Sequence, residues 1–142
     1  METMEARMVK LYARNNNHVA LHAIPGHFAT SHSHINFYID MTSLKTRANE
    51  AQEVAKSLAG DYVNSTVVDT IVCMDGTEVV GAYLAQEFEK RGFRNTNLHD
   101  TIYVVTPEYN ANNQLIFRDN MQLMVKDKNI LLLLATATTG KT

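Results

Sequence analysis

The carboxyl-terminal stretch of the chain, residues 129–142, constrains the fold more than any other part of the sequence. Five consecutive aliphatic residues, Ile130 to Leu134, are followed by small residues, threonines and one glycine. An aliphatic run of this length is typical of a strand buried on both faces of a parallel sheet. A glycine-bearing turn after such a strand offers backbone N–H groups and hydroxyls to an anion, usually a phosphate. The stretch therefore predicts an α/β protein with a phosphate-binding loop.

Composition argues against several classes of protein. The 142 residues suit one domain, which would bury roughly two-thirds of the surface of its unfolded chain. Thirteen basic and fifteen acidic residues give a net charge of −2 without a Lys/Arg cluster, which argues against a nucleic-acid surface. The one cysteine, Cys73, forms no internal disulfide, and neither a signal peptide nor a membrane-spanning apolar run is visible. We expect a cytoplasmic protein with no nucleic-acid and no membrane partner.

Residues 1–60 are expected to form two helices on either side of a ribbon. Apolar side chains at helical spacing predict an amphipathic helix over residues 3–15. Residues 21–40 alternate apolar and polar side chains around a Pro-Gly pair, which predicts a small antiparallel ribbon. Helical spacing returns over residues 46–58, and Gly60 is the expected terminator.

Strands and helices alternate in residues 61–142. The pattern predicts a strand over 67–74, a turn at 75–77, a helix over 78–91 ending at Gly92, a strand over 101–106, a polar loop over 108–113, a short hairpin pairing 114–118 with 121–125, and the final strand. Alternation of this kind predicts a mostly parallel sheet with helices on its faces and right-handed connections. The expected fold class is therefore α/β, with the ribbon of the first part as a separate small antiparallel element.

Three segments carry motifs that occur together in one family. Residues 26–40 read Gly-His-Phe and later two aromatics, Ile and Asp; residues 69–88 hold a strand, a glycine turn and a helix; residues 131–142 hold a strand and Thr-Thr-Gly. In this order the segments resemble the hood ribbon, pyrophosphate loop and 5-phosphate loop of type I phosphoribosyltransferases, and of orotate phosphoribosyltransferase in particular. The resemblance implies a single phosphoribosyltransferase-like domain over 1–142, with hood elements in 1–60 and an α/β core in 61–142.

The resemblance also implies an activity and its binding residues. A member of this family transfers a phosphoribosyl group from Mg²⁺-bound phosphoribosyl pyrophosphate to a nucleobase, here a pyrimidine such as orotate, in nucleotide metabolism. The residues that the resemblance assigns are Thr138, Thr139, Gly140, Lys141 and Thr142 for the 5-phosphate, Asp75, Gly76 and Thr77 for the pyrophosphate, and Ser31 and Tyr38 in the hood for the base. It assigns no catalytic side chain and no metal ligand.

We expect Tyr38 to face outward while Phe37 enters the core, because neighbouring strand residues alternate sides. A homodimer is expected, because the hood and an uncovered sheet edge would expose apolar surface.

The chain departs from the family at positions that matter for catalysis. Leu134 and Ala135 occupy the places of two acidic residues that bind the ribose hydroxyls. Thr30 and His32 replace a lysine and a glycine of the hood, and residues 108–113 contain no Lys or Arg where a basic catalytic loop is expected. Family members also continue through another helix and further strands, so a truncated member is expected. The alternative hypothesis is a non-catalytic relative that binds a nucleotide or phosphate, or serves as an interaction module.

Local features allow further interpretations. The tail from Ala135 to Thr142 comes within one glycine of a Walker A loop, but no residues remain for the helix and the magnesium-binding strand that an ATPase or kinase needs. The turn at 75–77 could bind pyrophosphate at a helix N-terminus, or Asp75 or Thr77 could simply cap that helix.

Five of the six histidines crowd the first quarter of the chain. His32 and His34 would share one face of a strand, and His18 and His22 one face of a helical turn. Because no Cys or Glu partner stands at suitable spacing, surface or hood roles are preferred to a metal site.

Overall fold

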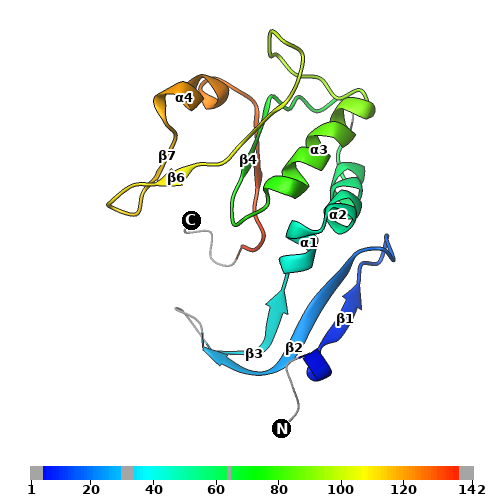
Figure 1. The fold of residues 1–142 in the computed structure, drawn as a ribbon. Coiled ribbons are helices and arrows are strands. Elements are labelled where there is room, and N and C mark those ends of the chain that lie inside the picture. The colour runs from blue at the N-terminus through cyan, green and yellow to red at the C-terminus, as the bar shows by residue number, and fades with distance from the viewer. Residues whose placement is uncertain (1–4, 30–33, 64, 138–142) are drawn as a thin grey trace.

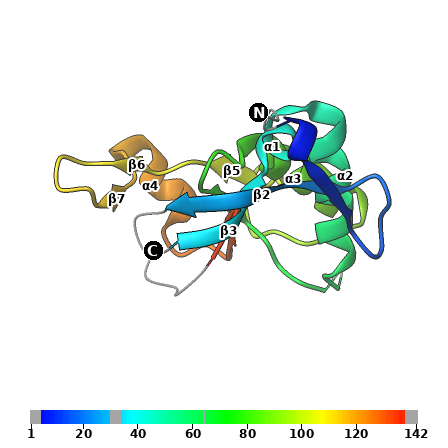
Figure 2. The same ribbon diagram turned by 90° about the horizontal axis from the view of Figure 1, so that it is seen from below.

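A computed structural model describes residues 5–29, 34–63 and 65–137. The chain is a mixed α/β protein with a small antiparallel sheet and a parallel sheet flanked by helices (Figure 1). We call the antiparallel sheet, in the order β1-β2-β3, the hood sheet, and the parallel sheet, in the order β5-β4-β8, the core sheet. The hood sheet lies beyond the carboxyl ends of the core strands, as the view from below also shows (Figure 2).

The hood sheet overturns the prediction of a helix over residues 3–15. A short 3₁₀ turn at Glu5–Arg7 is followed by strand β1, Val9–Tyr12, which pairs antiparallel with β2, Ala20–Ala29. The asparagines at positions 15–17 lie in the hairpin turn between β1 and β2, where the His18 amide donates to Asn16 Oδ1 at 2.9 Å. An asparagine side chain that accepts a hydrogen bond from the backbone two residues further on favours such a turn. Because the chain reverses there, residues 9–12 pair with β2, and this pairing outweighs their helical spacing.

The ribbon over residues 21–40 is confirmed as β2 and β3, His34–Asp40. The prediction that Phe37 enters the core while Tyr38 faces outward is wrong for Phe37. Both side chains are about half exposed, at 52% and 45%. The hood sheet is a single layer here, so alternation separates two open faces rather than a core face from a solvent face (Figure 1).

Two helices link the hood sheet to the core sheet. Helix α1 is Thr42–Thr46, and α2 is Ala48–Gly60, which confirms most of the predicted helix over 46–58. Arg47 interrupts them with an extended backbone, φ −85° and ψ 121°. The buried residues of α2 are three alanines at helical spacing, Ala51, Ala55 and Ala59, which let it pack closely against α3.

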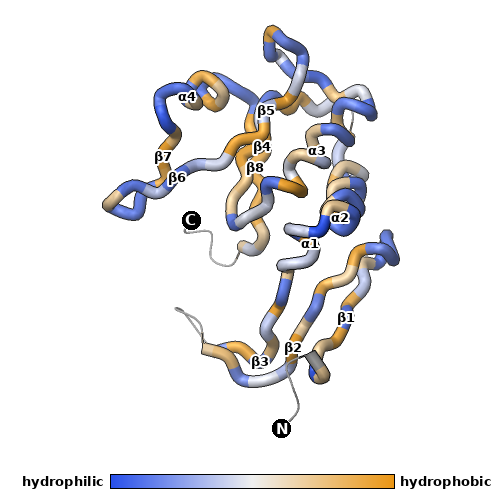
Figure 3. The backbone as a smooth tube through the Cα atoms, viewed as in Figure 1, coloured by the Kyte–Doolittle hydropathy of each residue, from blue (hydrophilic) through white to orange (hydrophobic). Residues whose placement is uncertain are grey.

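The core sheet confirms the predicted parallel arrangement. Its strands are β4, Thr70–Cys73, β5, Tyr103–Val105, and β8, Ile130–Leu133, with β4 in the centre. Helix α3, Glu78–Lys90, follows β4 as expected. Apolar residues concentrate on these three strands (Figure 3).

Strand β8 is not buried on both faces as predicted. Leu131 and Leu133 pack against the core formed with α2 and α3, whereas Ile130 and Leu132 are 47% and 55% exposed. Helix α4, Asp119–Val125, covers the other face mainly over β4 and β5. The outer side of β8 is therefore left open in the part of the chain that the structure describes.

The hairpin predicted at 114–118 and 121–125 is also wrong. The observed hairpin joins β6, Glu108–Tyr109, to β7, Leu115–Ile116, and residues 119–125 form α4. Asn110 Oδ1 accepts from the amides of Asn112 and Gln114, and Asn113 has φ 59°, so the asparagine-rich segment reverses the chain earlier than expected.

Among the described helices, none has the length and apolar character that crossing a membrane requires.

Candidate functional site

The turn between β4 and α3 has a backbone that few residues adopt. Asp75 and Gly76 both have positive φ, 56° and 74°, as in a type I′ turn, and the Thr77 amide closes the turn on the Met74 carbonyl at 3.2 Å. Glycine accepts this conformation freely and Asp is among the few other residues that tolerate it. The sequence Asp-Gly-Thr thus fits the turn that it was predicted to form.

Thr77 occupies the N-cap position of helix α3, as one of the two interpretations of the turn has it, but it makes no capping hydrogen bond with its side chain. No side chain caps this helix; the Thr77 hydroxyl instead donates to the Met74 carbonyl at 2.7 Å and lies 3.4 Å from the Leu133 carbonyl. The first amides of an α-helix have no partner within the helix. The N-terminus of α3 therefore points its first amides and the positive end of its dipole toward the edge of the core sheet at which the strands end, here called the carboxyl edge. The carboxylate of Glu78 in the first turn offsets part of this positive charge.

Strands β4 and β8 bring two predicted loops to one edge of the core sheet. Cys73 pairs with Leu133, and the Met74 amide donates to the Leu133 carbonyl at 2.9 Å. The segment after β8 consequently starts beside the Asp75–Thr77 turn. The residues predicted for the 5-phosphate, Thr138, Thr139, Gly140, Lys141 and Thr142, and Ser31 of the hood lie outside the described residues.

Lys45 is a site residue that the sequence did not reveal. It lies on α1, and its Nζ donates to the Asp75 carbonyl at 3.0 Å, which places a positive charge on the turn. The contact joins residues 30 positions apart, so no local pattern predicts it. Lys45 offsets the Asp75 carboxylate, which by itself would repel an anion at this turn.

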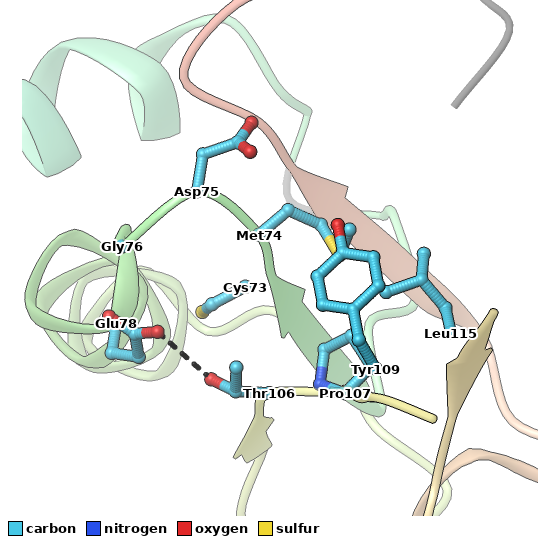
Figure 4. A pocket seen from close by; sticks show the side chains of 9 residues that line it. All are labelled: Cys73, Met74, Asp75, Gly76, Glu78, Thr106, Pro107, Tyr109 and Leu115. Atoms are coloured by element: carbon cyan, nitrogen blue, oxygen red, sulfur yellow. Dashed lines mark hydrogen bonds between the residues drawn. The ribbon is translucent and has the colours of Figure 1, made fainter. Parts of the chain in front are cut away.

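A pocket of about 280 Å³ opens next to the turn (Figure 4). Its lining residues are Cys73, Met74, Asp75, Gly76, Glu78, Thr106, Pro107, Tyr109 and Leu115. The Thr106 hydroxyl donates to Glu78 at 3.3 Å, and the Tyr109 ring comes from the β6–β7 hairpin. This mixture of one aromatic ring, aliphatic side chains and two carboxylates suits a flat organic ring that carries hydrogen-bond donors.

Neither Tyr38, which the sequence predicts to bind the base, nor the thiol of Cys73 provides a binding or reactive group in this pocket. Tyr38 lies on β3 of the hood sheet and does not line the pocket. Its ring packs against that of Phe28, with the two ring centroids 5.7 Å apart. Cys73 is fully buried, and burial, helped by the charge of Glu78, raises the pKa of its thiol to about 11. A thiol that stays protonated near neutral pH is a poor nucleophile, so Cys73 contributes shape rather than reactivity.

Asp69, at the amino end of β4, is a buried carboxylate with a structural role. Its Oδ1 accepts from the Thr96 amide at 2.5 Å, and its Oδ2 accepts from the amide and the side chain of Asn129, both at 2.8 Å. Burial acts to raise the pKa of Asp69, but these donors outweigh burial and hold the pKa below its usual value. Asp69 thereby ties the segments that precede β5 and β8 to the start of β4.

No protein-family model, curated protein or solved structure matches this chain. No group of three or more His, Cys, Asp or Glu side chains among the described residues is arranged to hold a metal ion. The function is therefore inferred from the residues and from the geometry of the carboxyl edge.

Proposed function

We propose that the chain is a phosphoribosyltransferase-like protein that binds phosphoribosyl pyrophosphate at the carboxyl edge of β4 and β8 and transfers the phosphoribosyl group to a nucleobase. The observation that carries the proposal is the parallel pairing of these two strands. Through it, the Asp75–Thr77 turn and the segment that follows Leu133 start side by side, linked by the Met74 hydrogen bond. Ligands of open α/β sheets bind outside the carboxyl ends of the strands.

The charges at the turn fit a phosphorylated ligand that arrives with Mg²⁺. The N-terminus of α3 and Lys45 attract an anion, whereas Asp75 and Glu78 repel it. Mg²⁺ is commonly bound by one or two carboxylates together with substrate phosphates, so an ion carried by the ligand would turn Asp75 into a favourable contact. Binding should therefore depend on Mg²⁺.

The adjacent pocket supplies a place for the base. Tyr109 and Leu115 would contact its faces, and Glu78 would accept hydrogen bonds from its N–H groups. A base nitrogen held there would displace pyrophosphate through a transition state with positive charge on the ribose, which positioning and nearby carboxylates stabilise.

A non-catalytic phosphate- or nucleotide-binding protein is the second candidate. Leu134 packs with Val72 and Met74 in the apolar cluster under α4, where a ribose-binding carboxylate would be required. The β6–β7 turn at residues 110–114 carries no Lys or Arg, and Arg118 nearby is held by Glu108 at 2.8 Å. These features favour binding without turnover.

We also propose that the protein forms a homodimer. Val9, Leu11, Phe37 and Ile39 of the hood sheet are between 41% and 53% exposed. The register Val9–Ala23–Ile39 puts the exposed apolar side chains of β1 and β3 on one face, on either side of the buried Ala23, and a second copy would cover them. Light scattering at high protein concentration should give the mass of a dimer; a monomeric mass would contradict this proposal.

Calorimetric titration with phosphoribosyl pyrophosphate tests the binding. We expect saturable, Mg²⁺-dependent binding that Lys45→Met weakens by about fivefold, since an exposed charge contact contributes up to about 1 kcal/mol. Lys90→Met, at the opposite end of α3, is the matched control and should bind like the wild type. Pyrophosphate release on adding nucleobases would favour the transferase, and binding without release would favour the second candidate. Absence of binding would contradict the transferase and leave the non-catalytic candidate.

A further inference from the structure

Two histidines of the hood sheet lie in direct contact. His27 Nε2 of β2 and His34 Nδ1 of β3 are 2.8 Å apart, with ring centroids at 4.9 Å and an interplanar angle of 43°. Both side chains are exposed. The pairs expected from the sequence are different: His18 and His22 do not share a helical face, because His22 lies in β2, and His32 lies outside the described residues.

The irregular pairing of β2 and β3 explains this contact. The register shifts between Pro25 and Phe28, and beyond the shift Ala29 pairs with His34. His27 is two residues before Ala29 and hence on the same face, diagonal to His34. Because Ala29 is small, the His34 ring can turn toward His27. The two rings are thus brought together by backbone register rather than by a chance overlap of long side chains.

We propose that His27 and His34 together bind one borderline transition-metal cation, Zn²⁺ being the reference case. Two nitrogens on one tetrahedral zinc, with Zn–N bonds of about 2.0–2.1 Å, are about 3.3 Å apart. The observed spacing is within about half an ångström of this, so a small rotation of two exposed rings suffices. The cation takes the place of the proton that joins the two neutral imidazoles in this contact. That proton moves through solvent to the other nitrogen of the donor ring, so both ligands remain neutral imidazoles.

The chemistry of the pair defines which ions it takes. Imidazole nitrogen suits zinc, copper and nickel, whereas Mg²⁺ and Ca²⁺ require oxygen ligands. The site is therefore separate in location and in ion preference from the Mg²⁺ expected with phosphoribosyl pyrophosphate. With two protein ligands, the remaining coordination positions are open to water or to an oxygen ligand.

Zinc titration of the chain without an affinity tag tests the proposal. Calorimetry near neutral pH with Zn²⁺ alone should show one ion per chain, and Mg²⁺ should not replace it. His27→Ala and His34→Ala should each weaken binding by at least about tenfold, because loss of even an outer-shell partner lowers metal affinity about 10- to 100-fold. His18→Ala removes an exposed histidine from the turn between β1 and β2 and should leave binding unchanged.

Thermal unfolding gives a second measure of zinc binding. An ion that binds only the folded hairpin raises the midpoint of thermal unfolding, so the same Zn²⁺ concentration should stabilise the wild type and His18→Ala more than either single variant of the pair. Circular dichroism would establish that the variants are folded. Absence of saturable zinc binding by the wild type, or unchanged binding by both His27→Ala and His34→Ala, would overturn the proposal.

Discussion

Asp69→Ala is expected to lower the free energy of unfolding by roughly 2 to 5 kcal/mol. The Asp69 side chain is fully buried and accepts hydrogen bonds from two backbone amides and from the Asn129 side chain. Alanine would leave the amides of Thr96 and Asn129 without this acceptor, and each unsatisfied buried group costs about 1–3 kcal/mol. Urea unfolding followed by circular dichroism measures the loss.

The control for this variant is Asp61→Ala, which removes an exposed carboxylate just after α2. Its effect on the free energy of unfolding should stay within about 0.5 kcal/mol.

The pH dependence of stability gives a further check on the role of Asp69. Because the folded pKa of Asp69 is lowered, its contribution is complete above the unfolded pKa of about 3.9 and disappears as the pH falls through the folded pKa. The difference between wild type and Asp69→Ala should therefore shrink in acid; a difference that grows in acid would contradict this role.

Gly81→Ala is expected to destabilise the protein by roughly 1 to 3 kcal/mol, although alanine favours helices. A Cβ at position 81 would collide with Cys73 Sγ and lie 3.3 Å from Val104 Cγ1. Both neighbours belong to the core sheet, so helix α3 would have to move away from β4. Overpacking of this kind outweighs the gain of about 1 kcal/mol from replacing a helical glycine.

Two further variants isolate the cause. Gly60→Ala is the matched control, because a Cβ there would meet only an Arg91 side-chain nitrogen at 3.9 Å, and this variant should be neutral or slightly more stable. The double variant Cys73→Ala/Gly81→Ala removes the colliding sulfur and should lose less stability than the sum of its single variants. Strict additivity would show that Cys73 is not what excludes a side chain at 81.

The β4–turn–α3 unit could be predicted because its signals are local. Gly92 was expected to end the helix; it has φ 78°, and the Phe93 amide bonds the Phe88 carbonyl at 2.9 Å. The Phe88 and Phe93 rings stack at 4.4 Å, the apolar contact that accompanies such an ending. Pattern, turn residues and terminator agree in this part of the chain, and agreement of this kind makes a prediction reliable.

Contacts between residues far apart in the sequence determine the secondary structure of the elements that were predicted wrongly. Residues 9–12 fit helical spacing, yet four register pairs with β2 make them a strand. Residues 119–125 form a helix because their methionines and Val125 pack under the core sheet after an earlier chain reversal. In both cases tertiary packing overrides a weak local preference.

The candidate site was predictable only in part for the same reason. The turn at Asp75–Thr77 follows from its residues, whereas Lys45 reaches it from 30 positions away. Tyr109 enters the pocket because the β6–β7 hairpin forms where a loop was expected. His27 and His34 meet because of a register shift that no spacing rule reveals.

Amide chemical shifts of ¹⁵N-labelled protein during titration with Mg²⁺ and phosphoribosyl pyrophosphate would locate the ligand on the molecule. If the carboxyl edge binds the phosphates, the largest changes will fall on Gly76, Thr77 and Glu78, whose amides lie at the turn and the start of α3. Amides of α2 at Ala59 and Gly60 should not shift. Saturable changes centred elsewhere, or no changes at all, would contradict a phosphoribosyl site at this edge.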